Sequence, residues 1–326
     1  MQLSQPVREE NHPLLQLLIL GLSAFIGLLI FIVIGFVICI AIYGLDLIKN
    51  TAWITGDDLR YIGALKILVT AQQIGLFLVP AIVLAIFEGK KPQNFYGFKT
   101  PKLEILGIVL LLMFFSMPLM SWINEQNMNM HLPSFLSDLE KWMRKMEDDG
   151  LVTTKAILAG TSVGALVINL LVIAVTPAIC EELIFRGYLM QGFYNLARNK
   201  WFPLVMTSVI FGTMHIFNPE VQKMGYLILV YYIGTGLFLG IITLMDEGTE
   251  LALGFHAANN MVAALLITSD FTVFQTHSVF KDLSEPSLDY EAFLPVFVIY
   301  PLLIFLFSKI YKWTNWKEKL FGTLKD

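Results

Sequence analysis

The sequence predicts an all-α fold, a polytopic membrane bundle of about eight transmembrane helices with one further helix on the membrane surface. Of its 326 residues, 56% are hydrophobic and only 15% are charged, whereas about a quarter of the residues of a soluble domain are charged. The apolar residues gather in long runs, and about 20 of them in a helix cross the hydrocarbon core of a bilayer. The connections between the runs are too short to fold as an independent domain.

The first apolar run, Leu14–Ile42, is long enough to span the bilayer. The apolar core of a signal peptide has only about 7–15 residues, so we expect an uncleaved first helix. Seven more runs qualify or nearly qualify as spans: Tyr61–Phe87, Ile105–Trp122, Ala156–Ile179, Phe202–Phe217, Gly225–Met245, Leu251–Ile267 and Ala292–Phe307. One helix from Ala156 to Ala197 would measure roughly 63 Å, twice the bilayer core, so we expect a break near Thr176–Pro177.

The segment between the third and fourth runs has the pattern of an amphipathic helix. Its apolar residues recur at helical spacing, and charged residues fill the opposite face. The apolar positions are Leu132, Phe135, Leu136, Leu139, Trp142, Met143 and Met146. Such a pattern is typical of a helix that lies on the membrane surface.

The Lys and Arg residues of the connections predict the orientation of the protein. The N-terminus, the connections after the second, fourth and sixth runs, and the C-terminus carry thirteen of them, and the opposite set carries eight. We therefore expect a multi-pass protein of the plasma membrane with both termini in the cytoplasm. Lys66 lies near a helix end, where its side chain can reach the interface. The net charge of −4 and the absence of a basic cluster predict no nucleic-acid partner.

Ionisable residues inside apolar runs are energetically costly and usually mark function, and the first group is Glu181, Glu182 and Arg186. Glu182 and Arg186 are four residues apart, so they share a helix face and can form an ion pair. Glu181 points about 100° away from Glu182. We therefore predict that Glu182 and Arg186 orient the helix, and that Glu181 is free to act as a general base.

The other two groups each contain a histidine. Phe211 and His215 share one helix face, and His256 and Asn260 share another. A lone histidine in a span is often a core residue bonded to a carbonyl, but these have partners. His256 and Asn260 can donate hydrogen bonds to a developing oxyanion. Alternatively, the two histidines and Glu181 form a two-His–one-carboxylate zinc site.

The chain order allows these groups to meet. Glu181 lies about as far before Arg198–Lys200 as His215 lies after it, so a helical hairpin there brings both to one depth. For His256 to join them, the fifth helix has to end within the membrane at Asn218–Pro219, which is tolerated only inside the protein or beside a water-filled cavity.

Two pairs of glycines four residues apart predict close helix contacts. Gly160 and Gly164 lie in the fourth run, and Gly236 and Gly240 lie in the sixth. Small residues at this spacing let helix backbones approach each other. We therefore expect the fourth and sixth runs to be core helices near the site.

The three patterns together resemble the motifs of the CPBP family, which comprises type II CAAX prenyl proteases and bacteriocin-processing or self-immunity membrane proteins. The motifs stand in order and without substitution: Glu181-Glu182-xxx-Arg186, Phe211-xxx-His215 and His256-xxx-Asn260. The resemblance covers about Ala156 to Ile267, and its helix count agrees with about eight spans.

The resemblance implies a role for each residue. Glu181 would activate the attacking water with the help of His215. His256 and Asn260 would hold the oxyanion, and the Glu182–Arg186 pair would fix the helix that carries Glu181. Members are described both as metalloproteases and as glutamate-dependent enzymes. Because the sequence has no HExxH motif, we favour no cofactor, with zinc as the alternative.

We therefore expect an intramembrane endopeptidase that cleaves a membrane protein or peptide within or beside the lipid bilayer, with a prenylated CAAX-type substrate as one possibility. The alternative is a non-catalytic binding or immunity protein, or a transporter, that uses the same buried polar cluster. We expect three parts: N-terminal helices with the surface helix (1–155), a catalytic core (156–267), and a last transmembrane helix with a cytoplasmic tail (268–326).

Overall fold

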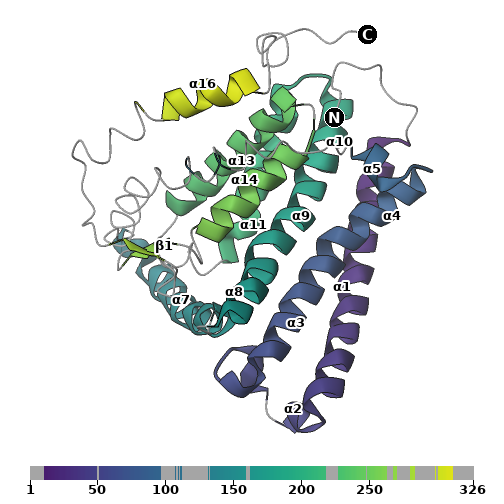
Figure 1. The fold of residues 1–326 in the computed structure, drawn as a ribbon. Coiled ribbons are helices and arrows are strands. Elements are labelled where there is room, and N and C mark those ends of the chain that lie inside the picture. Colours follow the sequence, from purple (N-terminus) through teal and green to yellow (C-terminus); the bar gives the residue numbers. More distant parts are fainter. Residues whose placement is uncertain are drawn as a thin grey trace.

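The structure, a computed structural model, describes residues 11–49, 51–96, 107, 109, 111, 131, 133–158, 162–217, 227–246, 248–262, 267–269, 280–282, 298 and 300–310. These residues form a bundle of helices with one pair of three-residue strands (Figure 1). Within the described part of the chain, three helices are long and apolar enough to cross a membrane: Pro13–Tyr43, Leu59–Phe87 and Val163–Ala197. The chain is an integral membrane protein, and the prediction of an all-α membrane bundle is confirmed.

The first part of the chain is a helical hairpin. α1 (Pro13–Tyr43) begins with a proline, which needs no N–H at that position, and ends at Gly44, whose φ of 80° suits glycine. The returning helix packs along α1 (Figure 1). The elements after α1 are α2 (Asp46–Lys49), η1 (Ala52–Ile54), η2 (Leu59–Tyr61), α3 (Ile62–Gln73), η3 (Ile74–Leu78), α4 (Val79–Phe87) and α5 (Pro92–Phe95).

The middle of the chain is one long helix. After η4 (Ser134–Leu136) and α7 (Ser137–Leu158), the chain is helical without interruption from Val163 to Ala197. Its consecutive segments are α8 (Val163–Asn169), η5 (Leu170–Val175), α9 (Thr176–Glu182), η6 (Leu183–Leu189) and α10 (Met190–Ala197). The break that we expected near Thr176–Pro177 is therefore wrong.

A π-helical turn explains how the helix passes Pro177. Proline has no N–H, and its ring clashes with the carbonyl four residues earlier. That carbonyl belongs to Ile173, inside the π-helical segment η5, where the helix is wider. The same arrangement recurs in the hairpin, where the π-helical η3 precedes Pro80 and contains Leu76. The sequence pattern of a proline in an apolar run is thus accommodated twice by local widening.

The C-terminal half packs against the long helix. Arg198 ends α10 in the left-handed conformation, with φ 55°, and Asn199 accepts hydrogen bonds from the first two backbone N–H groups of the next helix. The predicted hairpin at Arg198–Lys200 is therefore present. The elements that follow are α11 (Trp201–Met214), η7 (His215–Phe217), α13 (Leu227–Asp246), α14 (Glu250–Met261), β1 (Ile267–Ser269), β2 (Phe280–Asp282) and α16 (Tyr300–Ile310).

The glycines of α13 lie at its contact with α11. A methyl group on Gly236 would lie 2.9 Å from the Cα atom of Ser208, and Gly240 faces Leu204. The close approach predicted for this pair is confirmed. Gly164 is different, because a methyl group there would have only Ser162, at 3.9 Å, nearby. Its partner in the predicted pair, Gly160, lies outside the described residues.

One buried cluster joins the N-terminal hairpin to the long helix. It contains side chains from α1, η3, α9, η6 and α11, among them Leu20, Phe77, Cys180, Phe185 and Phe211. α14 packs on the other side of the long helix, against η5 and α9. The long helix therefore lies between the hairpin and the C-terminal helices (Figure 1).

Two predicted segments differ from the structure, and a third cannot be compared with it. Ala156 lies in α7, because the fourth span begins only at Val163, where the Ser162 hydroxyl caps the helix. Ile267 lies in β1, which pairs in parallel with β2, and not in the seventh helix. The third predicted span, Ile105–Trp122, falls almost entirely outside the described residues.

Lys66 does not extend to the interface as we expected. It is buried, and its Nζ donates to Asn169 Oδ1 at 2.6 Å. Asn169 in turn donates to the Leu158 carbonyl at 3.1 Å. This hydrogen bond gives the buried ammonium group a partner within the protein, and it joins α3 to α8.

The amphipathic segment forms the helix that its spacing predicts. α7 has large apolar side chains in solvent-accessible positions, including Trp142, and Phe135 just before it is 82% exposed. Exposed aromatic side chains of this kind suit the membrane interface. The position of α7 on the membrane surface stays a prediction.

Candidate active site

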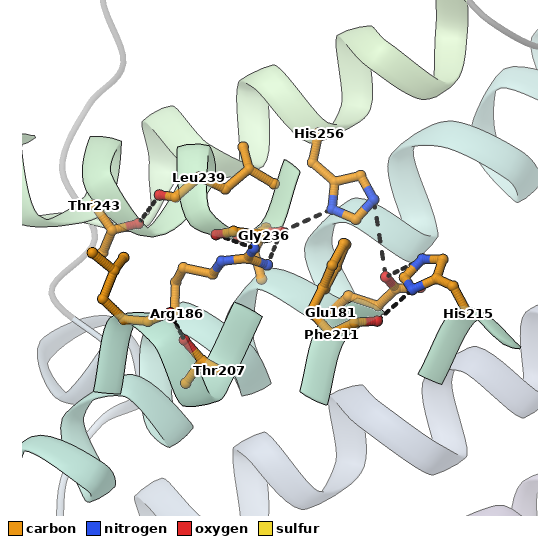
Figure 2. A network of polar contacts seen from close by, with 11 residues as sticks. Glu181, Arg186, Thr207, Phe211, His215, Gly236, Leu239, Thr243 and His256 are labelled. Carbon is orange, nitrogen blue, oxygen red and sulfur yellow. Dashed lines mark hydrogen bonds and ion pairs between the residues drawn. The ribbon is translucent and has the colours of Figure 1, made fainter. Parts of the chain in front are cut away.

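A buried ion pair forms one side of the candidate site. Arg186 Nη1 lies 2.7 Å from Glu182 Oε1, as the four-residue spacing predicts, and both side chains are almost fully buried. Arg186 Nη2 also donates to the Gly236 carbonyl at 3.1 Å, and its guanidinium lies 4.6 Å from the centre of the Phe211 ring. This arginine therefore joins η6, α11 and α13 (Figure 2).

The same Glu182 oxygen holds His256 of α14. His256 Nδ1 lies 2.8 Å from Glu182 Oε1. A carboxylate can only accept, so Nδ1 carries the hydrogen. The other ring nitrogen, Nε2, is then directed away from Glu182 and toward Glu181 (Figure 2).

His215 is fixed by the end of its own helix. Its backbone N–H bonds to Gly212 and Thr213, in a tighter turn than an α-helix, and this leaves the Phe211 carbonyl without that donor. His215 Nδ1 takes its place at 2.6 Å. A carbonyl oxygen only accepts, so Nδ1 carries the hydrogen and a neutral ring has its lone pair on Nε2. The ring is stacked on Tyr232, with centroids 4.2 Å apart.

The two Nε2 atoms converge on Glu181. Each lies 3.9 Å from Glu181 Oε2, and the side chains of Glu181, His215 and His256 are 11%, 13% and 6% exposed. This distance is too long for a direct hydrogen bond, and it suits one water molecule between each pair. Figure 2 shows the rings approaching Glu181 from separate helices. The three groups come from α9, the end of α11, and α14.

Asn260 lies one turn beyond His256, and its side chain bonds to the backbone of the long helix. Its Nδ2 donates to the Ile173 carbonyl at 3.4 Å. Ile173 lies four residues before Pro177, which has no N–H to donate. Asn260 therefore supplies a hydrogen bond to the widened segment of the long helix. An amide nitrogen carries two hydrogens, so this contact leaves one for another acceptor.

Two residues near the site were missed by sequence reasoning. The first is Gln73, the last residue of α3, which packs against α9, and its side-chain oxygen is buried without a hydrogen-bond partner among the described residues. The signal for Gln73 is a neutral amide within an apolar run. Tyr232 is the second, and an aromatic residue in an apolar helix gives no such signal.

The side chains around Glu181 are the candidate ligands of a zinc ion. Among these, no group of three or more His, Cys, Asp or Glu side chains could hold a metal ion. The ring orientations resemble those of zinc ligands, since each Nδ1 is bonded to a carboxylate or carbonyl. However, the ligand atoms of a tetrahedral zinc site lie about 3.3 Å apart, and here the pairs are 3.9 Å apart. As placed, the three side chains do not fit zinc.

Comparison with known proteins covers the segment that carries these groups. Residues 163–262 match the family described as type II CAAX prenyl endopeptidase Rce1-like. This segment is therefore similar to the Rce1-like family. The match begins with α8 and ends just after α14, so the Rce1-like segment includes Glu181, His215 and His256 and excludes Gln73.

One similar curated protein is the uncharacterized protein YyaK of Bacillus subtilis (strain 168). It is 30% identical over 139 residues, which are 43% of this chain and 45% of YyaK. The matched region is thus less than half of either protein. No solved structure matches.

Proposed function

We propose that this protein is an intramembrane endopeptidase, and one observation carries the proposal. A buried carboxylate, Glu181, lies at equal distance, 3.9 Å, from the Nε2 atoms of two histidines that come from other helices. Both rings are oriented by a bond at Nδ1. An acid and two oriented imidazoles around one point can hold and activate a water molecule. The similarity of residues 163–262 to the Rce1-like family supports this activity.

We assign water activation to Glu181 with His215. A water between Glu181 Oε2 and His215 Nε2 faces two lone pairs, and Glu181 takes one of its protons. The water oxygen then bonds to the peptide carbonyl carbon. As the C–N bond breaks, the proton passes from Glu181 to the leaving amine nitrogen. The products are a carboxylic acid and an amine, and Glu181 returns to its ionised form.

We assign the oxyanion to His256 and Asn260. His256 donates from Nε2 in its imidazolium form, with Nδ1–H directed at Glu182. Asn260 contributes the amide hydrogen that Ile173 does not use. Donors fixed before the reaction stabilise the developing negative charge without reorganising. Arg186 acts through Glu182, because its ion pair keeps that carboxylate in place as the acceptor for His256.

The substrate that we propose is a peptide bond in a membrane-embedded or membrane-proximal protein, with prenylated CAAX-type chains among the candidates. Residues 156–267 would be the catalytic core, between an N-terminal part (1–155) and a C-terminal part (268–326). We also propose that both termini are cytoplasmic and that the membrane is the plasma membrane. A reporter that is active only outside the cytoplasm can be fused to either terminus. Activity of such a fusion would contradict this orientation.

The test compares peptide cleavage by variants at Glu181 and His215 with cleavage by variants at a matched control pair. Purified protein in detergent is given prenylated and unmodified peptides, and products are measured by mass spectrometry. Glu181→Gln and His215→Ala should each lower kcat by at least about 1,000-fold while the protein stays folded. The control is a surface pair of the same residue types, His131 and Glu140, 3.0 Å apart. Glu140→Gln and His131→Ala should leave kcat unchanged.

Two results would overturn the proposal. Cleavage that persists in both Glu181→Gln and His215→Ala would remove these residues from the reaction. Absence of any peptide product from the wild type, together with Glu181-dependent uptake or binding of a ligand, would favour a transporter or binding protein built around the same cluster.

A further inference from the structure

Tyr232 of α13 lies face to face with the ring of His215. The two ring centroids are 4.2 Å apart, and the two ring planes differ by only 23°. The same tyrosine packs against the buried cluster that contains Phe211. Stacked aromatic rings attract each other, so this contact restrains the plane of the imidazole. Tyr232 belongs to none of the three sequence motifs that carry the candidate site.

The position of His215 in the chain explains why its ring needs a second restraint. His215 begins the 3-10 segment η7, directly after the last residue of α11, and helix ends are held less firmly than helix interiors. The bond from Nδ1 to the Phe211 carbonyl fixes one atom of the ring. A carbonyl oxygen accepts a hydrogen over a broad range of directions, so this bond alone leaves the tilt of the ring open. The stacked tyrosine removes that freedom.

Tyr232 reaches the end of α11 because α11 and α13 pack closely there. Gly212 lies three residues before His215, and a methyl group on it would be 2.4 Å from Cγ1 of Ile233 and 3.1 Å from the backbone nitrogen of Ile233. Small residues allow helix backbones to approach in this way. The residue next to Ile233, Tyr232, is therefore carried to the imidazole by backbone packing.

The same face of α13 also supports the second histidine of the site. Gly236 lies one turn after Tyr232, and its carbonyl accepts a hydrogen bond from Arg186 Nη2 at 3.1 Å (Figure 2). Arg186 pairs with Glu182, and Glu182 holds His256 at Nδ1. One helix face thus restrains one imidazole through an ion pair and the other through a stacked ring.

We propose that Tyr232 is a positioning residue, whose ring holds His215 at the tilt that directs Nε2 toward the attacking water. This inference rests on the proposed peptidase function. The water directs its hydrogens at Glu181 and at His215 Nε2, so its lone pairs face away from both, toward the substrate carbonyl. A change in the tilt of the imidazole displaces this water, and a displacement of about 1 Å near reacting atoms can cost about 100-fold in rate. The role requires the tyrosine ring and not its hydroxyl group.

The kinetic test separates the ring of Tyr232 from its hydroxyl group and from helix packing. Tyr232→Leu removes the stacked ring and should lower kcat about 10-fold with KM within about twofold. Tyr232→Phe keeps the ring and should retain the wild-type kcat. The control is Phe238→Leu on the same helix, because Phe238 packs edge to face on Phe255 with centroids 5.3 Å apart, and it should behave as the wild type. Equal kcat in Tyr232→Leu and Phe238→Leu would overturn the proposal, as would an equal loss in Tyr232→Leu and Tyr232→Phe.

A magnetic resonance test separates failure of this inference from failure of the proposed function. The chain has five histidines, so selective labelling resolves their ring signals, and His215→Ala identifies the signal of His215. An aromatic ring stacked on the imidazole shifts that signal, because its circulating electrons change the local magnetic field. Tyr232→Leu should remove the shift, whereas Tyr232→Phe and Phe238→Leu should keep it. An unchanged signal in Tyr232→Leu contradicts the contact whether or not any peptide is cleaved. A changed signal in a protein that cleaves nothing would refute the peptidase and the positioning role together, while leaving the contact.

Discussion

Two buried polar clusters of this protein differ in how fully their hydrogen bonds are made. In the first, Lys66 donates to Asn169 and Asn169 donates to a backbone carbonyl, so the main polar groups have partners. In the second, around Glu181, buried polar atoms lack partners among the described residues. These atoms are Gln73 Oε1, Glu181 Oε2, Glu182 Oε2 and Arg186 Nε.

The comparison teaches how to separate a structural cluster from a reactive one. Unsatisfied buried polar atoms are destabilising, so a cluster that serves only packing tends to satisfy all of them. The Lys66–Asn169 pair does so and joins two helices. The Glu181 cluster leaves buried donors and acceptors without partners among the described residues, and two histidine Nε2 atoms converge on Glu181, as binding of water and substrate requires. Ionisable residue type alone does not distinguish them.

The largest expected effect comes from removing the cation of the second cluster. Arg186→Met removes the arginine partner of the buried Glu182 carboxylate. Breaking a buried pair in this way costs about 3–5 kcal/mol, so we expect a large fall in thermal stability together with loss of activity. The control is Arg60→Met, because Arg60 also forms an ion pair, with Asp58, but its side chain is exposed. Thermal unfolding in detergent measures both variants, and an unchanged midpoint for Arg186→Met would show that the pair does not support the fold.

The next effect tests the two contacts of Asn260. Asn260→Ala removes the hydrogen bond to Ile173 and the amide that we assign to the oxyanion. We expect kcat to fall about 100-fold, as for other oxyanion donors, and the unfolding free energy to fall by about 1 kcal/mol. Steady-state kinetics and thermal unfolding on one preparation separate the two effects. A loss of stability with unchanged kcat would restrict Asn260 to supporting the widened helix.

A smaller effect, on stability alone, is expected in the satisfied cluster. Lys66→Met keeps the length of the side chain and removes the donor to Asn169. The buried Asn169 oxygen then has no donor, which costs about 1–3 kcal/mol, while kcat of the folded protein should stay at the wild-type value. Lys141→Met is the control, since Lys141 is exposed. A fall in kcat at full stability would show that the two clusters are coupled.

The smallest expected effect is that of a chelator. Because the side chains around Glu181 do not fit zinc as placed, we expect cleavage to continue after incubation with a chelator and dialysis. The measurement is kcat before and after treatment, with metal analysis of the purified protein. Loss of cleavage that added zinc restores would instead make Glu181, His215 and His256 metal ligands.

The membrane fold and the pairing of side chains along one helix follow from the sequence alone. Long apolar runs fix the solvent as lipid, and four-residue spacing fixes which side chains share a helix face, because both properties are local to the chain. The Glu182–Arg186 pair and the hairpin at Arg198–Lys200 follow from such local rules.

Only the tertiary structure decided what depends on contacts between distant segments. Pro177 lies inside a continuous helix because η5 widens the turn before it and Asn260 bonds the Ile173 carbonyl. Lys66 is buried because Asn169, 103 residues later, accepts from it. The N-terminal hairpin reaches the helix that carries Glu181 because η3 packs against α9. A hydrogen bond across such sequence separations is set by how helices pack, and no spacing within one helix encodes it.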